Sequence, residues 1–261
     1  MIDMHCHLAD NKFKDDLDEV IQRATASGVQ KMVVVPEFES QFDKVLEISK
    51  NHPGIVFAGI GVHPIQKRNK SVKMKHVAKI EEYLVANEKK VVCIGEVGLD
   101  HTVSQFKLTE ADFEEQEQVF NYQIDLSKQF DKPLNVHSRS AARKTIEVLR
   151  NAGVSKDRVV LHAFDGDVEE AALGVEAGYL FSVPPSFVHS ERAAKVMESV
   201  PLHLLLLETD SPALGPVKNV KNVPENIRLS AEFLAKVKGI SIEDVMNATN
   251  RNAHRLFNFL S

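Results

Sequence analysis

Residues 91–100 read VVCIGEVGLD, and the pattern in this stretch decides the fold. An apolar, β-branched run becomes polar at its carboxyl end, where Glu96 and Asp100 stand close to glycines. Runs that are apolar almost throughout are typical of strands covered on both faces of a parallel sheet. The stretch therefore predicts a buried parallel strand that carries ionisable side chains at one end.

The same pattern occurs eight times along the chain. The apolar runs span residues 1–5, 31–36, 55–62, 91–98, 133–138, 158–164, 179–183 and 202–210. Segments with a helical period span 12–27, 38–51, 71–88, 109–130, 140–152, 167–177, 189–199, 225–238 and 241–259. Alternating strands and helices indicate βαβ units. Eight such units predict an α/β fold, a (β/α)₈ TIM barrel that forms a single domain over residues 1–261. A doubly wound open sheet is the alternative.

Composition narrows the class of protein. The chain has 261 residues, 43% of them hydrophobic, and a net charge of −5. This balance excludes a basic protein that coats nucleic acid, so phosphate contacts must come from a local patch or from bound metal. Cys6 and Cys93 are too few for a disulfide framework. No apolar run is long enough to span a membrane or to form a signal peptide. We therefore expect a cytoplasmic or nuclear monomer that is not secreted.

Ionisable residues gather at the carboxyl ends of the predicted strands. In a TIM barrel these ends surround one cavity, so their convergence predicts a metal site. His5 and His7 share a strand face and point into the barrel mouth, whereas Cys6 faces the helices. Glu96 shares its face with Ile94, so Cys93 is expected to be a packing residue. Glu208 either orients a histidine ligand or acts directly.

The ordered motifs of the chain are D-x-H-x-H at 3–7, G-x-H-P at 61–64, G-E-x-G-L-D at 95–100, H-x-R-x-A at 137–141, H-x-F-x-G at 162–166 and E-T-D-S-P at 208–212. This set resembles the TatD-like metal-dependent deoxyribonucleases of the amidohydrolase superfamily, from Asp3 to about Leu256. The resemblance implies a TIM barrel, a divalent metal centre and hydrolysis of DNA phosphodiester bonds. It implies metal ligands at His5, His7, Glu96, His137, His162 and Asp210.

The ligand set suits two divalent ions per chain. Imidazole and carboxylate ligands without thiolate fit Zn²⁺ or Mn²⁺ and tolerate Mg²⁺. The first and last strands are neighbours in a closed barrel, so we expect His5, His7 and Asp210 on one ion. His137 and His162 belong to neighbouring strands and are expected on the other ion. Glu96 has two oxygens and is expected to bridge both ions, and Asp210 is the candidate to accept a proton from metal-bound water.

Candidate substrate contacts lie around these ligands. Arg139 lies two residues after His137, on the same face of the strand, and is therefore a candidate to bind a phosphate of the substrate. His101 stands where the family often has an aromatic residue, and Lys221-Asn222-Val223-Pro224 stands where the family commonly has Arg-Asn-Glu-Pro. The remaining candidates of the predicted substrate site are His63 and Asp100.

A basic run follows His63. It contains Lys67, Arg68, Lys70, Lys73 and Lys75. The run is either a phosphate-binding surface or a solvated loop and helix start. So few cations in a chain of net charge −5 favour gripping a strand end or a short single strand of DNA. We therefore expect an exonuclease rather than a protein that covers long duplex.

Two other classes of function are the alternatives, and among them hydrolysis of a phosphate ester or an aminoacyl-nucleic acid fits the residues almost as well as cleavage of DNA. A metal-activated water also attacks carbonyls, so the chain could hydrolyse another ester: a small phosphate ester, a lactone or amide, or an aminoacyl-nucleic acid. Lactone and amide hydrolases of this superfamily often bridge their metals with a carbamylated lysine at the fourth strand end. Here that position holds Glu96, and Lys89 and Lys90 precede the strand. A non-catalytic scaffold would have lost ligands, and all six are present.

Overall fold

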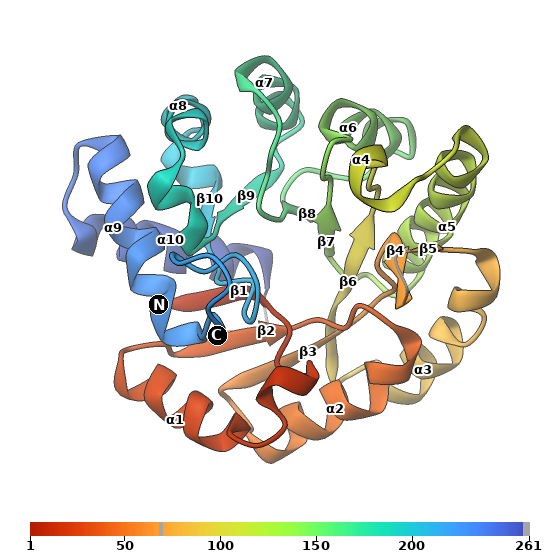
Figure 1. Cartoon of the computed structure of the whole chain (residues 1–261), viewed down its shortest axis with the longest axis horizontal. Coiled ribbons are helices and arrows are strands. Elements are labelled where there is room, and N and C mark those ends of the chain that lie inside the picture. The colour runs from red at the N-terminus through yellow and green to blue at the C-terminus, as the bar shows by residue number, and fades with distance from the viewer. Residues whose placement is uncertain (68–69, 258–261) are drawn as a thin grey trace.

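In the computed structural model, which describes residues 1–67 and 70–257, eight parallel strands form the centre of the molecule (Figure 1). In spatial order they are β1 (Ile2–Cys6), β2 (Lys31–Val34), β3 (Val56–Ile60), β6 (Val91–Gly98), β7 (Leu134–His137), β8 (Val159–Leu161), β9 (Leu180–Val183) and β10 (Leu205–Leu207). Each of the eight predicted strand runs overlaps one of them, and β1 ends one residue beyond its predicted run, 1–5.

Backbone hydrogen bonds join the two ends of this sheet. The N–H of Asp210 donates to the carbonyl of His5 at 2.8 Å, and the N–H of His7 donates to the carbonyl of Ser211 at 2.7 Å. The segment after β10 is thereby tied to β1. The predicted TIM barrel is confirmed, and the open doubly wound sheet is wrong, because an open sheet leaves its outermost strands unpaired.

Helices surround the strands (Figure 1). They are α1 (Leu17–Ala26), α2 (Phe42–Asn51), α3 (Ile80–Asn87), α4 (Val103–Phe106), α5 (Glu110–Gln129), α6 (Ala142–Asn151), α7 (Val168–Glu176), α8 (Glu191–Ser199), α9 (Ile227–Lys238) and α10 (Ile242–Leu256). Four of them begin after a residue whose side chain accepts a hydrogen bond from the first turn: Thr109, Asp167, Ser190 and Ser241. Each predicted helical segment contains one helix, and residues 258–259 of the last segment lie outside the described residues.

Two short elements were not expected from the sequence. The strands β4 (Ile65–Gln66) and β5 (Lys70–Ser71) pair as an antiparallel hairpin after β3. The helix α4 follows β6. Because both follow the carboxyl ends of barrel strands, they add walls to the end of the barrel where the ionisable residues gather.

Two apolar clusters hold the barrel together. The larger lies between strands and helices and includes Cys6, as expected. The smaller draws residues from strands around the barrel, among them Met4, Val33 and Leu206, and therefore fills its interior. Cys93 is a buried packing residue of this inner cluster, whereas Ile94 belongs to the outer one. The predicted alternation along β6 is wrong here, because the strand pairing shifts register between Ile94 and Val97.

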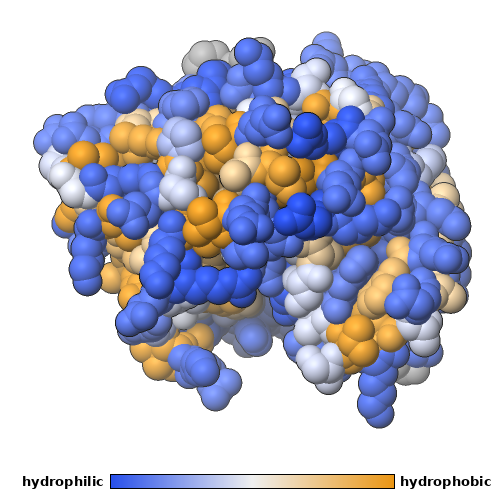
Figure 2. Space-filling model, turned by 90° about the horizontal axis from the view of Figure 1, so that it is seen from above, coloured by the Kyte–Doolittle hydropathy of each residue, from blue (hydrophilic) through white to orange (hydrophobic). Residues whose placement is uncertain are grey.

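The face of the molecule seen in Figure 2 is mainly hydrophilic, and apolar residues show between its polar side chains. Exposed large apolar side chains among the described residues include Val85, Val217 and Val220. Within the described part of the chain, none of the helices combines the length and the apolar character that a membrane span requires.

Candidate metal centre

The six expected metal ligands meet at the carboxyl end of the barrel. His5 lies in β1 and His7 directly after it, Glu96 lies in β6, His137 ends β7, and His162 and Asp210 follow β8 and β10. All six side chains are buried. Five of them line a cavity of about 430 Å³, and the fully buried His5 lies behind its wall.

Glu96 stands at the middle of the group. Its Oε2 lies 3.2 Å from His7 Nε2 and 3.6 Å from His5 Nε2. Its Oε1 faces three other rings: His137 Nδ1 at 2.8 Å, His162 Nε2 at 3.5 Å and His63 Nε2 at 3.6 Å. The two oxygens of one carboxylate thus face two different sets of histidines.

The first set contains His5, His7 and Asp210. Asp210 Oδ1 lies 3.4 Å from His5 Nε2 and 3.2 Å from His7 Nε2, and the two Nε2 atoms are 3.1 Å apart. His5 Nδ1 faces Asn135 Oδ1 at 2.7 Å, and His7 Nδ1 faces the carbonyl of Val35 at 3.0 Å. Because both partners only accept hydrogen bonds, Nδ1 carries the proton of the neutral ring and Nε2 presents a lone pair.

When both rings are neutral, these two lone pairs cannot hydrogen-bond to each other, but they suit a common cation. Ligand nitrogens about 2.0–2.1 Å from an ion, at angles of about 90–110°, lie about 2.8–3.4 Å apart. The 3.1 Å between His5 Nε2 and His7 Nε2 falls in that range. The donor set therefore fits a divalent metal ion between His5, His7 and Asp210.

The second set contains His137, His162 and His63, and Glu208 orients the His162 ring. Both Glu208 oxygens lie 3.1 Å from His162 Nδ1, and the N–H of Ala163 donates to Oε1 at 2.9 Å. Glu208 therefore fixes the His162 ring and leaves its Nε2 toward Glu96. His63, expected as a substrate contact, lies with Glu96 and His137 in a group whose ligand atoms are within 4.8 Å of one another.

The buried carboxylates of the centre need positive charge beside them. Burial lowers the pKa of His7, but the carboxylates of Asp210 and Glu96 raise it well above its usual range. Burial raises the pKa of Glu96, but His63, His5, His137 and His7 hold it well below its usual range. Such a cluster keeps its carboxylates ionised only while positive charge surrounds them, either as protons on the histidines or as bound metal.

Glycines let the chain approach closely around Glu96. A Cβ at Gly95 would lie 2.6 Å from Asn135 Cβ, so only glycine lets β6 and β7 pack at this point. Gly98 has φ +139°, and a Cβ there would lie 2.0 Å from the carbonyl oxygen of His137. The G-E-x-G spacing therefore brings Glu96 and His137 together.

Arg139 lies at the cavity, although its guanidinium is already engaged. Its Nε and Nη2 donate to Asp100 Oδ2 at 2.9 and 2.6 Å, and its Cζ lies 5.1 Å from the centre of the Phe106 ring. The same Asp100 oxygen lies 3.0 Å from His137 Nε2. Asp100 is fully buried and does not line the cavity, so it links Arg139 to His137.

Two other expected substrate contacts do not line the cavity. The His101 ring lies 4.0 Å from the ring of Phe113. Lys221 donates to both oxygens of Asp16, at 2.6 and 2.8 Å. The structure thus brings His63 and Arg139 to the cavity but not Asp100, His101 or Lys221. Arg68 lies outside the described residues.

Several residues of the site were not foreseen. Asn135 holds His5, and its position two residues before His137 on one strand was the available signal. Asp10, Glu37 and Phe38 line the cavity from segments that follow β1 and β2. No motif marks these three, because their place depends on how the loops fold over the barrel.

Comparison with known proteins places this centre in a family. Residues 2–258 match the family described as TatD related DNase. Deoxyribonuclease TATDN3 of Homo sapiens is 44% identical over 261 residues, which cover 98% of this chain and 94% of that protein. The uncharacterized metal-dependent hydrolase MJ1582 of Methanocaldococcus jannaschii is 31% identical over 258 residues, 98% of this chain and 96% of that protein.

Solved structures agree with the sequence comparison. The crystal structure of YJJV, a TatD homologue from Escherichia coli K12, superposes with a TM-score of 0.86 and 28% sequence identity, and the match covers 99% of this chain and 98% of that chain. The chain therefore belongs to the TatD related DNase family of metal-dependent hydrolases.

Proposed function

We propose that the protein is a divalent-metal-dependent deoxyribonuclease that removes nucleotides from the ends of DNA, with a preference for single strands. The observation that carries this proposal is the buried Glu96 carboxylate, whose two oxygens face two separate groups of histidines. Membership of the family, and the relative named a deoxyribonuclease, support DNA as the substrate.

We propose two divalent ions per chain, which are Zn²⁺ or Mn²⁺ or Mg²⁺. His5, His7 and Asp210 would hold one ion, and His63, His137 and His162 the other, with Glu96 between them. Bound divalent ions would lower the pKa of water to about 7 and neutralise charge on the phosphate.

The residues of the chain have separate roles in this proposal. Asp210 is ionised at neutral pH, because the His5 and His7 side chains outweigh its burial and lower the pKa of its carboxyl. Its carboxylate lines the cavity and accepts the proton that the attacking water loses. The Arg139 guanidinium lines the same cavity and binds a phosphate oxygen.

The cavity supports action on strand ends. Its volume of about 430 Å³ lies in the range of small-ligand pockets, about 300–1,000 Å³. A cavity of this size suits one nucleotide at the end of a chain better than the continuous path of a duplex. We propose that the whole chain acts as one domain and as a monomer.

The test uses end-labelled DNA. Chelation should abolish degradation of single-stranded DNA, and added Mn²⁺, Zn²⁺ or Mg²⁺ should restore it. Mononucleotides should appear from the first time points, and labels at the 5′ and 3′ ends give the polarity. Full activity of the chelated protein would contradict the metal mechanism. Long fragments at early times would indicate an endonuclease. Hydrolysis of simple esters without any cleavage of DNA would favour the alternative ester hydrolase.

A further inference from the structure

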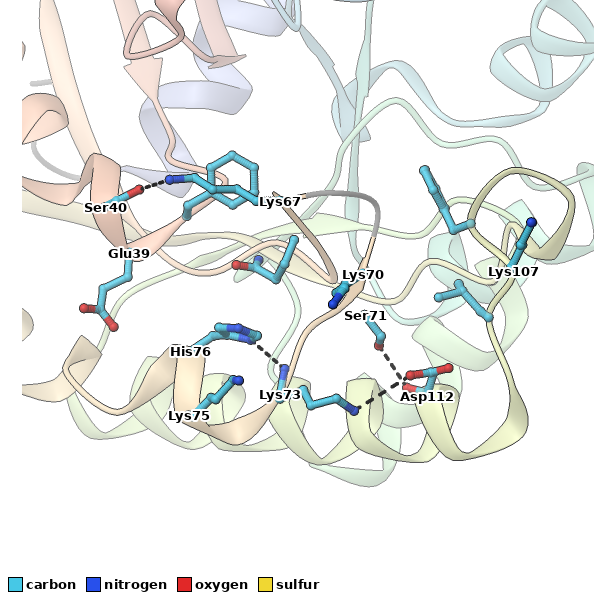
Figure 3. Close-up of a pocket in the computed structure, with 14 residues that line it drawn as sticks. Glu39, Ser40, Lys67, Lys70, Ser71, Lys73, Lys75, His76, Lys107 and Asp112 are labelled. Atoms are coloured by element: carbon cyan, nitrogen blue, oxygen red, sulfur yellow. Dashed lines mark hydrogen bonds and ion pairs between the residues drawn. The ribbon is translucent and has the colours of Figure 1, made fainter.

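A second cavity adjoins the metal centre and is lined by lysines. It has a volume of about 630 Å³ and lies between the segment after β2, the hairpin β4–β5, the segment before α3 and the segment after α4. Figure 3 shows Lys67, Lys70, Lys73, Lys75 and Lys107 around it. We call this cavity the lysine groove. Lys107 comes from a part of the chain distant from the other four, so no basic run in the sequence announces the whole group.

The acidic residues of the groove are already paired. Asp112 lies 3.8 Å from the amine of Lys73, which also contacts Glu115. Glu39 lies 3.3 Å from Lys79, outside the groove. The acids of the groove therefore do not neutralise its other cations.

Four lysines of the groove form no ion pair with any residue that the structure describes: Lys67, Lys70, Lys75 and Lys107. All four are exposed. The only contacts of the Lys67 amine among the described residues are the Ser40 hydroxyl at 3.0 Å and the Phe38 ring, with 5.5 Å to its centre. Four uncompensated cations gathered in one hollow of a chain with net charge −5 form a local site for anions.

The lysine groove and the metal cavity share a wall. Phe38, Gln66, Lys67 and Phe106 line both of them. The two partly exposed phenylalanines carry cations on their rings, Lys67 on Phe38 and Arg139 on Phe106. An anionic chain that leaves the metal centre across this wall would meet aromatic faces first and the free lysines next. Such a sequence of contacts suits a single-stranded nucleic acid, whose bases stack on rings while its phosphates meet lysines.

We propose that the lysine groove holds the sugar–phosphate backbone of the DNA strand next to the scissile bond, so that the enzyme grips phosphates beyond the one at the metal centre. This assignment rests on the proposed nuclease function. In this assignment the uncleaved strand lies on the side of the barrel that carries β4–β5 and α4. A nucleic acid fits better than an acidic peptide, because the groove continues into a centre built for phosphate chemistry.

The test compares two double variants of the full chain. In the groove variant, Lys70→Gln is combined with Lys107→Gln, which removes free cations from two separate segments. In the matched control, Lys50→Gln is combined with Lys89→Gln. Lys50 and Lys89 are also exposed and have no ion pair among the described residues, but they lie before β3 and β6, at the opposite end of the barrel.

Binding is measured by fluorescence anisotropy on the metal-loaded protein, with labelled phosphorothioate oligonucleotides of two and six nucleotides that resist hydrolysis. The native protein should bind the longer strand more tightly. The groove variant should lose that difference, and at 0.1 M salt its affinity should fall about 10- to 30-fold. Its slope of log K against log salt should decrease by about 0.7 for each lost phosphate contact. The control variant should match the native protein in affinity and in salt slope.

Hydrolysis is measured separately, on the same oligonucleotides with ordinary linkages and on bis(p-nitrophenyl) phosphate, which is too small to reach the groove. The ratio of kcat/KM for the long strand to that for the small diester should fall in the groove variant. Native affinity and salt slope in the groove variant would overturn the groove assignment even if DNA is cleaved. If polyglutamate competes as well as the oligonucleotide, the nucleic-acid assignment is wrong. Binding through the groove without any cleavage of DNA would instead refute the nuclease function, and would leave the groove as a binding site for single-stranded DNA with no scissile bond beside it.

Discussion

Each oxygen of Glu96 faces a different set of histidines, so single-residue variants at this centre should differ in kind. Glu96→Ala should weaken both metal sites together, because it removes a shared ligand and leaves two cations less shielded from each other. His162→Ala should weaken mainly one site, since His63 and His137 remain beside it. The measurement is metal content and binding isotherms after exchange into metal-poor buffer. One site at full affinity in Glu96→Ala would make Glu96 an ordinary ligand of a single ion.

A single substitution also tests the role of Arg139. Lysine keeps the charge but cannot reproduce the two hydrogen bonds to Asp100 or place a guanidinium over the Phe106 ring. Arg139→Lys should therefore lower kcat/KM on DNA by about tenfold, equivalent to about 1.4 kcal/mol. Arg158→Lys is the control, because Arg158 donates to Asp131 at 2.6 Å far from the cavity. Equal kinetics for the two variants would make the Arg139–Asp100 pair an ordinary structural contact.

At the scale of single elements, the packing of β6 against β7 depends on the glycines of β6. Gly98→Ala would place a Cβ 2.0 Å from the carbonyl oxygen of His137, in a backbone conformation that disfavours side chains. We expect the free energy of unfolding to fall by about 2–4 kcal/mol, from overpacking and backbone strain together. Gly54→Ala is the control, since Gly54 also has a positive φ, +77°, but open space around it.

Gly54→Ala should cost only about 1–2 kcal/mol. Urea unfolding of the metal-free variants separates the two contributions. Equal losses would show that the approach of β6 to β7 relaxes without cost, and that the Gly98 position carries only a backbone preference.

For the whole molecule, the stabilising effect of metal should grow with pH. In the metal-free protein, burial lowers the pKa of His162, but Glu208 outweighs it and raises the pKa to about 9. The folded pKa exceeds the unfolded value of about 6.5. The stability from this proton is therefore fully present below pH 6.5 and is lost as pH rises toward 9, on the order of 3 kcal/mol.

Metal binding displaces such protons, so the metal-loaded protein should keep its stability over this interval. The difference in Tm between metal-loaded and chelated samples should increase from pH 6.5 to 9. A saturating ion adds about 2.7 kcal/mol at a concentration a hundred times its Kd. Calorimetry in buffers of different ionisation heats should also show protons released on binding. A difference in Tm that is independent of pH would mean that the histidines are already neutral in the metal-free protein.

The sequence by itself determined the barrel and which ionisable residues meet at its mouth. Apolar runs and helical periods are local properties, and a closed βα barrel places all carboxyl strand ends in one mouth. His5 and His7 could therefore be placed together with Glu96 and Asp210 without coordinates. Strand parity also placed Cys6 among the helices.

Only the tertiary structure decided which of the candidate residues lie together. The alternation of strand faces predicted Ile94 on the inner face of β6, but Cys93 lies there instead. The cause is the register shift of β6 against β7, and a register shift depends on the partner strand. His63, predicted as a substrate contact, lies beside Glu96 and His137 in the candidate metal centre, and Lys221 does not line the cavity of that centre. The lysine groove joins Lys107 to a distant basic run. Ion pairs, loop paths and shared cavity walls are contacts between segments far apart in the chain, so no local pattern records them.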